Sequence, residues 1–248
     1  MGLPLKMSWL LLAMFIVLSL AGFAQISFFN MPNPDMLAHP GAAYIEYDRY
    51  QSLRENNFVN ASVFRFSYQV TNYLEVGANT WINNDHPLDP NRIVLSSKWR
   101  IKLYQKGNIA ITMSPGNWSS IYLSENPGTK HLIYNFFGFT HQEGPKAYTR
   151  LMLGAYGKYI RTIQNDTYGA IAGLEHRFND KIEFVADYFQ GSGEGFGLAT
   201  GIVYYAMDNG HNLPLYFAYQ FDNDSRANDL FLFQIGYFFS IRKPAPVH

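Results

Sequence analysis

The chain of 248 residues contains no cysteine. This absence excludes disulfide bonds, thiolate metal sites and a cysteine nucleophile, and also the lipid-modified N-terminal cysteine of a bacterial lipoprotein. Charge is scarce as well: charged residues make up 15% of the chain, and 19 basic residues balance 19 acidic ones. Such a chain lacks the basic footprint of a nucleic-acid-binding protein, so nucleic acid is not an expected partner.

Long hydrophobic runs are missing beyond the N-terminus. Hydrophobic residues make up 48% of the chain and aromatic residues 17%, yet the mean hydropathy is −0.14. After residue 24 no run reaches the roughly 18 apolar residues that a transmembrane helix needs. Strands that alternate apolar and polar residues produce this combination, because each strand dilutes its apolar face with polar side chains.

The first 24 residues have the pattern of an export signal. Lys6 supplies the positive charge, Trp9 to Leu20 the apolar stretch, and Gly22-Phe23-Ala24 a small-x-small cleavage site before Gln25. An uncleaved helical anchor is the alternative, although the apolar stretch is short for a membrane span. We expect residues 1–24 to be a signal peptide and residues 25–41, which hold three prolines, to form an irregular periplasmic leader.

From Ala42 onward, segments with alternating polarity recur between turn-forming residues. Compact connections alternate with longer ones along the chain, as expected for short periplasmic turns and longer external loops. An even number of strands returns both ends to the periplasm; about twelve fits the pattern, and ten or fourteen would also satisfy the rule. The expected strands are Ala42–Tyr50, Phe58–Val70, Tyr73–Ile82, Arg92–Tyr104, Ile109–Ser114, Lys130–Thr140, Tyr148–Tyr159, Tyr168–Phe178, Ile182–Phe189, Phe196–Met207, Leu213–Phe221 and Asp229–Phe239.

The sequence therefore predicts an all-β fold: a single antiparallel transmembrane β-barrel over residues 42–239, followed by a periplasmic tail at 240–248. A soluble barrel would place the apolar face of each strand inside instead. Two features favour a membrane. About twelve strands enclose more room than apolar side chains fill, and aromatic residues cluster near the expected strand ends, as in membrane-interface girdles.

The last expected strand contains the rhythm Phe233-x-Ile235-x-Tyr237-x-Phe239. It resembles the C-terminal assembly signal of bacterial outer-membrane proteins, an alternating aromatic strand that finishes on Phe. The nine residues from Ser240 to His248 depart from that pattern, in which the Phe is usually last. The resemblance implies a Gram-negative outer-membrane location, outer-membrane lipids as surroundings and the barrel-insertion machinery as a partner. An ordinary aromatic edge strand is the alternative.

The alternation also predicts which charged side chains face the lumen. We expect opposed basic and acidic walls, which would act on small polar solutes as rings of charge do in pores. A salt-bridged plug is the alternative. The basic residues are Arg65, Lys98, Arg100, Lys102 and Arg150; the acidic ones are Glu46, Asp48, Glu183 and Asp187.

The longest expected connection runs from Pro115 to Thr129, and its Trp118 and Tyr122 would suit a loop that folds inward to narrow the channel, as in general porins. A solvent-exposed loop is the other interpretation. The rival class is an enzyme, since twelve-stranded outer-membrane phospholipases use Ser and His on the outer wall. Their closely spaced His-x-Ser is missing here, and Ser124 with His131 is the nearest candidate pair.

We therefore expect a porin-like channel for passive passage of small polar solutes, without enzymatic activity, metal or cofactor. A structural barrel that displays loops is the second interpretation, and a lipid hydrolase the third. The sequence does not specify the solute or the oligomeric state.

Overall fold

The computed structural model describes residues 37, 39–52, 60–83, 90–122, 129–144, 147–160, 167–191, 197–206, 213–223 and 229–240. The predicted signal peptide, most of the leader and the tail after Ser240 lie outside this set. Within these ranges no helix is both long and apolar enough to span a membrane.

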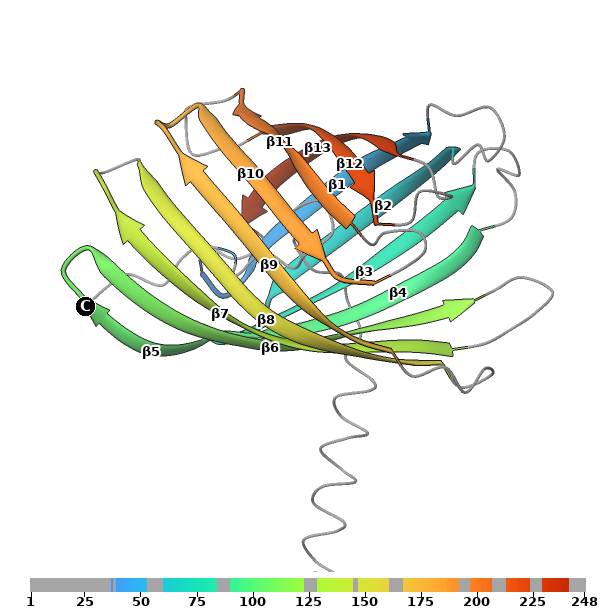
Figure 1. Cartoon of the computed structure of the whole chain (residues 1–248), viewed down its shortest axis with the longest axis horizontal. Helices are drawn as coiled ribbons and strands as arrows, with labels where there is room; N and C mark the ends of the chain where they lie inside the picture. Colours follow the sequence, from blue (N-terminus) through green and yellow to red (C-terminus); the bar gives the residue numbers. More distant parts are fainter. Residues whose placement is uncertain are drawn as a thin grey trace, which may run out of the picture.

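Thirteen β-strands make up the described part of the chain (Figure 1). They are β1 (Ala42–Ser52), β2 (Asn60–Gln69), β3 (Leu74–Asn83), β4 (Pro90–Trp99), β5 (Ile101–Lys106), β6 (Ile109–Tyr122), β7 (Thr129–Gln142), β8 (Tyr148–Ile160), β9 (Thr167–Arg177), β10 (Ile182–Phe189), β11 (Gly197–Tyr205), β12 (Pro214–Asp222) and β13 (Leu230–Ser240).

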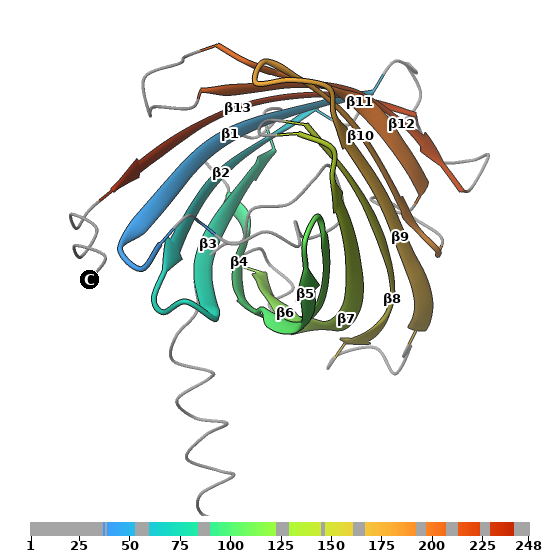
Figure 2. The same cartoon turned by 90° about the vertical axis from the view of Figure 1, so that its left-hand side faces the viewer.

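The strands form one closed antiparallel ring. Every strand except β4 pairs with the next along the chain, and β1 pairs with β13 from Ala42↔Ser240 to Ser52↔Leu230, which closes the sheet (Figure 2). β4 and β5 both pair with β6 and form one strand that is interrupted at Arg100. If β4 and β5 are counted as one interrupted strand, the barrel has twelve strands. This confirms the predicted all-β, single antiparallel barrel.

One predicted boundary was wrong. The connection expected from Pro115 is a continuation of β6, which runs to Tyr122 and pairs with β7 throughout. Proline interrupts a ladder because it has no N–H to donate. β6 pairs with β4 as far as Gly116 and with β5 from Met113, so its ladder is already interrupted between these residues, opposite Arg100. Pro115 lies within this gap, where no N–H donor is needed. Trp118 and Tyr122 are thus strand residues rather than loop residues.

Successive side chains alternate between two walls, as β-geometry requires. On β10, for example, Glu183, Val185, Asp187 and Phe189 are buried, and the residues between them are partly or fully exposed. Large apolar side chains dominate the exposed wall: Leu153 is 68% exposed and Ile133 65%. Buried charges and exposed apolar residues are the reverse of a soluble barrel and suit a lipid surrounding.

The turns at the end of the barrel that holds Ala42 and Ser240 are compact and internally bonded. Thr71 accepts hydrogen bonds on its hydroxyl from the Tyr73 and Leu74 amides. Asn179 accepts from the Lys181 and Ile182 amides in the same way. Gly107, between β5 and β6, has a φ of 53°, which glycine adopts without steric cost.

Candidate functional site: the barrel interior

Nine ionisable side chains are buried on the inner wall of the described barrel. Six of them are carboxylates and three are bases, so acidic side chains outnumber basic ones in the interior. They are Glu46, Asp48, Arg65, Glu75, Lys98, Arg150, Glu175, Glu183 and Asp187. We call these nine residues the polar belt.

Arg65 on β2 organises the part of the belt that lies against β1. Its Nε atom pairs with a carboxylate oxygen of Asp48 and lies 3.2 Å from Oε1 of Glu46. Its Nη2 atom donates to the hydroxyl of Tyr50 at 2.7 Å, and the hydroxyl of Tyr44 donates to Glu46. One guanidinium therefore neutralises charge on two neighbouring carboxylates, which its planar fork of donors allows.

A second group joins β8, β9, β10 and β11. Nη1 of Arg150 pairs with Glu175, and the Tyr148 hydroxyl donates to Glu175 at 2.9 Å. Glu183 accepts from the Tyr205 hydroxyl at 3.0 Å and from Tyr148 at 3.4 Å. The Tyr148 hydroxyl on β8 thus contacts carboxylates on both β9 and β10, although β8 and β10 are not adjacent in the sheet.

The third group is an ion pair between β4 and β3. Nζ of Lys98 lies 3.3 Å from Oε1 of Glu75, and both side chains are fully buried. The backbone amide of Leu37 donates to the other Glu75 oxygen at 3.2 Å. Leu37 is itself buried against Ala42 and Tyr44, so this point of the leader lies inside the mouth of the barrel.

The predicted arrangement of the charges needs correction. Basic and acidic residues do not form opposed walls; each buried base pairs locally with carboxylates on a neighbouring strand. Arg100 is half-buried at the strand break, and Lys102 is exposed on β5, where its Nζ donates to Gln105. The carbonyl of Tyr73, just before β3 begins at Leu74, accepts from the Arg100 amide. β5 starts at Ile101 and runs past this point, so β3 does not extend alongside Lys102. The other seven predicted residues are in the polar belt.

Two members of the belt, Glu75 and Glu175, were missed in the sequence analysis. Both lie on the polar side of alternating strands, so the parity rule that selected Lys98 and Glu183 could have found them. Tyr44, Tyr148 and Tyr205 were missed for another reason. A tyrosine near a strand end is also what an interfacial aromatic girdle contains. Alternation alone does not show that its hydroxyl contacts a buried carboxylate.

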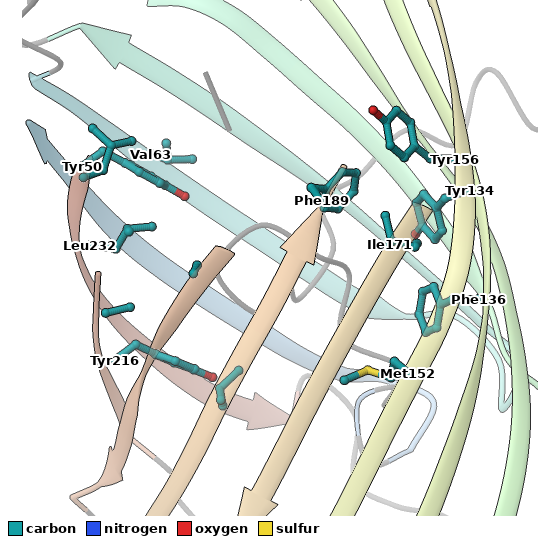
Figure 3. Close-up of a cluster of buried hydrophobic side chains, with 14 of the residues drawn as sticks. Tyr50, Val63, Tyr134, Phe136, Met152, Tyr156, Ile171, Phe189, Tyr216 and Leu232 are labelled. Atoms are coloured by element: carbon teal, nitrogen blue, oxygen red, sulfur yellow. The ribbon is translucent and has the colours of Figure 1, made fainter. Parts of the chain in front are cut away.

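An apolar cluster fills another part of the interior (Figure 3). Tyr134, Phe136, Tyr156 and Phe189 belong to it, and Trp118 packs against it. The rings of Trp118 on β6 and Phe189 on β10 stack with centroids 6.4 Å apart, although three strands separate β6 from β10 in the sheet. This contact crosses the interior, so aromatic side chains narrow the lumen beside the polar belt.

Among the described residues, no group of three or more His, Asp or Glu side chains could hold a metal ion.

No family model matches the chain, and no curated protein matches its sequence. Similar solved structures include the KdgM porin in complex with disordered oligogalacturonate, at TM-score 0.49 and 9% identity over 80% of this chain and 98% of that one. The translocator domain of the autotransporter NalP from Neisseria meningitidis aligns at TM-score 0.40 and 12% identity, covering 82% and 90%. The Ralstonia pickettii toluene transporter TbuX aligns at TM-score 0.37 and 11% identity, covering 90% and 97%.

At this level of identity the class of the protein follows from its own two walls. A closed antiparallel barrel with an apolar exposed outside and charged buried inside is a transmembrane barrel of the bacterial outer-membrane type. The fold is therefore the closed, single antiparallel barrel that the alternation of polar and apolar residues predicted. The barrel has twelve strands, and both the polar belt and the apolar cluster lie in its interior.

Proposed function

We propose that the protein is a narrow channel for passive passage of small polar solutes across the outer membrane. The observation that carries this proposal is the polar belt. Ionisable side chains at membrane depth are costly to bury and commonly mark a path for ions or polar solutes. Here nine of them gather on the inner wall, with tyrosine hydroxyls and buried Gln220 and Gln234 among them.

A purely structural interior would not need this chemistry. Apolar side chains of similar volume usually replace buried ion pairs at no loss of stability, or with a gain of about 1–4 kcal/mol. Keeping six carboxylates and three bases inside therefore serves something other than stability. Solvation of a permeating solute is such a role, because the belt offers it hydrogen-bond donors and acceptors in place of water.

The composition of the belt favours cations over anions. Its carboxylates outnumber its bases by six to three, and a low-dielectric wall strengthens the field that this imbalance creates. Asp187 is buried on β10 between Val185 and Phe189, which both belong to the apolar cluster. We expect it to contribute to the selectivity of the narrowest part.

A barrel without an open pore is the second candidate. The observation in its favour is the depth of burial: Lys98, Gln69, Gln220 and Gln234 are all less than 2% exposed, although they face the interior. Under this alternative the belt and the apolar cluster form a plug, and the loops carry the function.

Single-channel recording of the refolded protein in a planar bilayer separates the two candidates. The channel proposal expects discrete openings and a reversal potential in a salt gradient that indicates cation preference. Asp187→Asn should reduce this preference, whereas Asp229→Asn, beyond the end of β12, should leave it unchanged. Silence from correctly folded protein would support the plug.

Export to the outer membrane belongs to the same proposal. Phe233, Ile235, Tyr237 and Phe239 lie on the outer wall of β13, where the insertion machinery would read them before β1 closes the ring. Mature protein should therefore fractionate with outer membranes and change its gel mobility on boiling. Recovery as a detergent-free periplasmic monomer would contradict both the location and the channel.

A further inference from the structure

A track of polar side chains interrupts the apolar outer wall. Ser97 on β4, Asn117 and Ser119 on β6, and His131 on β7 occupy outward positions, opposite in parity to the inward Ser96, Trp118 and Leu132. Ser97 is directly paired with Asn117, and Ser119 with His131. We call these four residues the outer-wall track. Polar groups that face lipid are costly unless they serve a purpose, because lipid offers them no hydrogen bonds.

Three hydrogen bonds connect the four residues of the track. The Ser97 hydroxyl donates to Oδ1 of Asn117 at 2.5 Å. Nδ2 of Asn117 donates to Oγ of Ser119 at 3.3 Å. Oγ of Ser119 lies 2.9 Å from Nδ1 of His131. Ser119 has one hydroxyl proton, and no hydrogen bond of the track uses it before His131. It can therefore be donated to Nδ1 of His131 in the tautomer that carries the ring proton on Nε2.

This is the arrangement that activates a serine hydroxyl, in which a neutral imidazole accepts the hydroxyl proton. The barrel carries a second hydroxyl–imidazole pair with the opposite polarity. Thr149 Oγ1 lies 2.8 Å from Nδ1 of His176, but the Thr149 hydroxyl donates to Glu143. His176 must therefore donate to Thr149, and that hydroxyl has no base. The comparison distinguishes the track from an ordinary polar contact.

We propose that Ser119 and His131 form an acyl-transfer site on the outer wall, with Asn117 as a donor to the oxyanion, and that its substrate is a carboxylic ester of an outer-leaflet lipid or similar amphiphile. The surroundings support this class. Leu95 is paired with Ser119, Ile133 with Asn117, and Ile121 follows two residues after Ser119. Ile133 is 65% exposed and Ile121 38%, so acyl chains have apolar surface to lie on.

The height of the track also suits an amphiphile. Ser119 lies three residues before the end of β6 at Tyr122, and His131 two residues after the start of β7 at Thr129. Three residues of strand span roughly 10 Å. The nucleophile is thus a short distance below the rim opposite the chain ends, where the ester of a lipid would lie beneath its headgroup.

The reaction balances with water as the only co-substrate. Ser119 Oγ attacks the ester carbonyl carbon while its proton passes to Nδ1 of His131, and Nδ2 of Asn117 can donate to the carbonyl oxygen as it becomes negative. The bond to the alcohol breaks and the alcohol leaves with the proton from His131. Water then attacks the acyl-Ser119, gives its proton to His131, and the carboxylic acid leaves as Oγ regains that proton.

Ser124, the serine that the sequence placed nearest to His131, lies outside the described residues, and the hydroxyl that the structure sets beside His131 is that of Ser119. The site departs from the expectation of a barrel without enzymatic activity. It does not depend on the lumen, because the track and the polar belt lie on opposite walls. A closed barrel could hydrolyse esters, and an open channel could do so as well.

The test uses full-length protein refolded in detergent, with folding verified by its heat-dependent gel mobility. A fluorescent fluorophosphonate should label the folded protein, and peptide mass spectrometry should place the label on Ser119. Hydrolysis of diacylphosphatidylcholine in mixed micelles should fall about 10²–10⁴-fold in Ser119→Ala and His131→Gln, the range for loss of a general base. Asn117→Ala should lower kcat about 10²–10³-fold, as loss of an oxyanion donor does.

Thr149→Ala and His176→Gln are the matched controls, since they remove the second hydroxyl–imidazole pair from the same wall; both should label and hydrolyse like the unmodified protein. Absence of label and hydrolysis in folded unmodified protein would overturn the proposal. So would a label that maps elsewhere or hydrolysis that persists in Ser119→Ala. If Ser119→Ala does not fold, the mapped label and His131→Gln decide the question.

Discussion

Replacing Glu75 by Gln removes one charge from the ion pair with Lys98 and little else. The amide is close to isosteric with the carboxylate, and its oxygen can still accept the hydrogen bond from the Leu37 amide. The change removes the negative charge that lies 3.3 Å from Nζ of Lys98, while the ammonium stays fully buried. Glu75→Gln is therefore a direct probe of whether the polar belt is held together by charge.

The size of the effect follows from the geometry. At 3.3 Å the two charges attract each other with about 5 kcal/mol if the effective dielectric constant is about 20. Breaking a buried pair by removing one partner typically costs about 3–5 kcal/mol, because the remaining charge stays desolvated. We expect Glu75→Gln to lower the free energy of unfolding by about that amount. In Glu75→Gln/Lys98→Met neither charge of this pair is left, and most of the loss should be recovered.

The assay is urea unfolding of the protein refolded into lipid vesicles, followed by tryptophan fluorescence. Two results would refute the reasoning. A loss below about 1 kcal/mol in Glu75→Gln would mean that Lys98 is hydrated, as exposed ion pairs are. A double variant as unstable as the single one would mean that Glu75 acts through shape rather than charge.

Three further predictions concern the outer wall, the packing of the inner wall and the width of the lumen. Leu153→Arg, at a 68% exposed position inside β8, should cost about 2–4 kcal/mol in the same unfolding assay, whereas Tyr168→Arg at the start of β9 should cost about 0–1 kcal/mol. Equal costs would mean that the outer wall does not face lipid. Gly236→Ala places a methyl group against the ring of Tyr44 and should lower the free energy of unfolding by about 1–3 kcal/mol. In Gly144→Ala the new methyl group meets nothing within 4 Å, so this control should be neutral. A neutral Gly236→Ala would contradict the packing of β13 against Tyr44. Trp118→Ala removes the ring that stacks on Phe189 across the interior and should raise single-channel conductance, whereas Trp99→Ala on the outer wall should not; unchanged conductance in both would place the narrowest point elsewhere.

The fold could be predicted from the sequence because alternation is a local property. In β10 Glu183 and Asp187 indicate which parity faces inwards, and the apolar Val185 and Phe189 share their wall because side chains alternate along the strand. The same rule placed Glu46, Asp48, Arg65 and Lys98 on the inner wall, where they are buried. The strand count followed from the alternation of compact and longer connections, which also depends only on neighbouring residues.

The errors arose where non-local pairing decides the outcome. Pro115 signals a strand end by its chemistry, yet β6 continues because its gap coincides with the break at Arg100 on the neighbouring strand. Lys102 has the parity of a lumen residue, but burial there needs a third strand, and β3 starts too late to provide one. The partner of His131 was uncertain for the same reason, since the β6–β7 register alone sets Ser119 beside it.

The central claim, that solutes pass along the inner wall, is tested most directly by cysteine substitution, since the native chain has no cysteine to interfere. Leu198 and Ala199 are neighbours on β11 with opposite exposure: Leu198 is 42% exposed on the outer wall, and Ala199 is fully buried on the inner wall. A charged, membrane-impermeant thiol reagent added during single-channel recording should reduce the current through Ala199→Cys and leave that through Leu198→Cys unchanged. Absence of current in both folded variants, or a current through Ala199→Cys that the reagent does not alter, would contradict passage through the lumen.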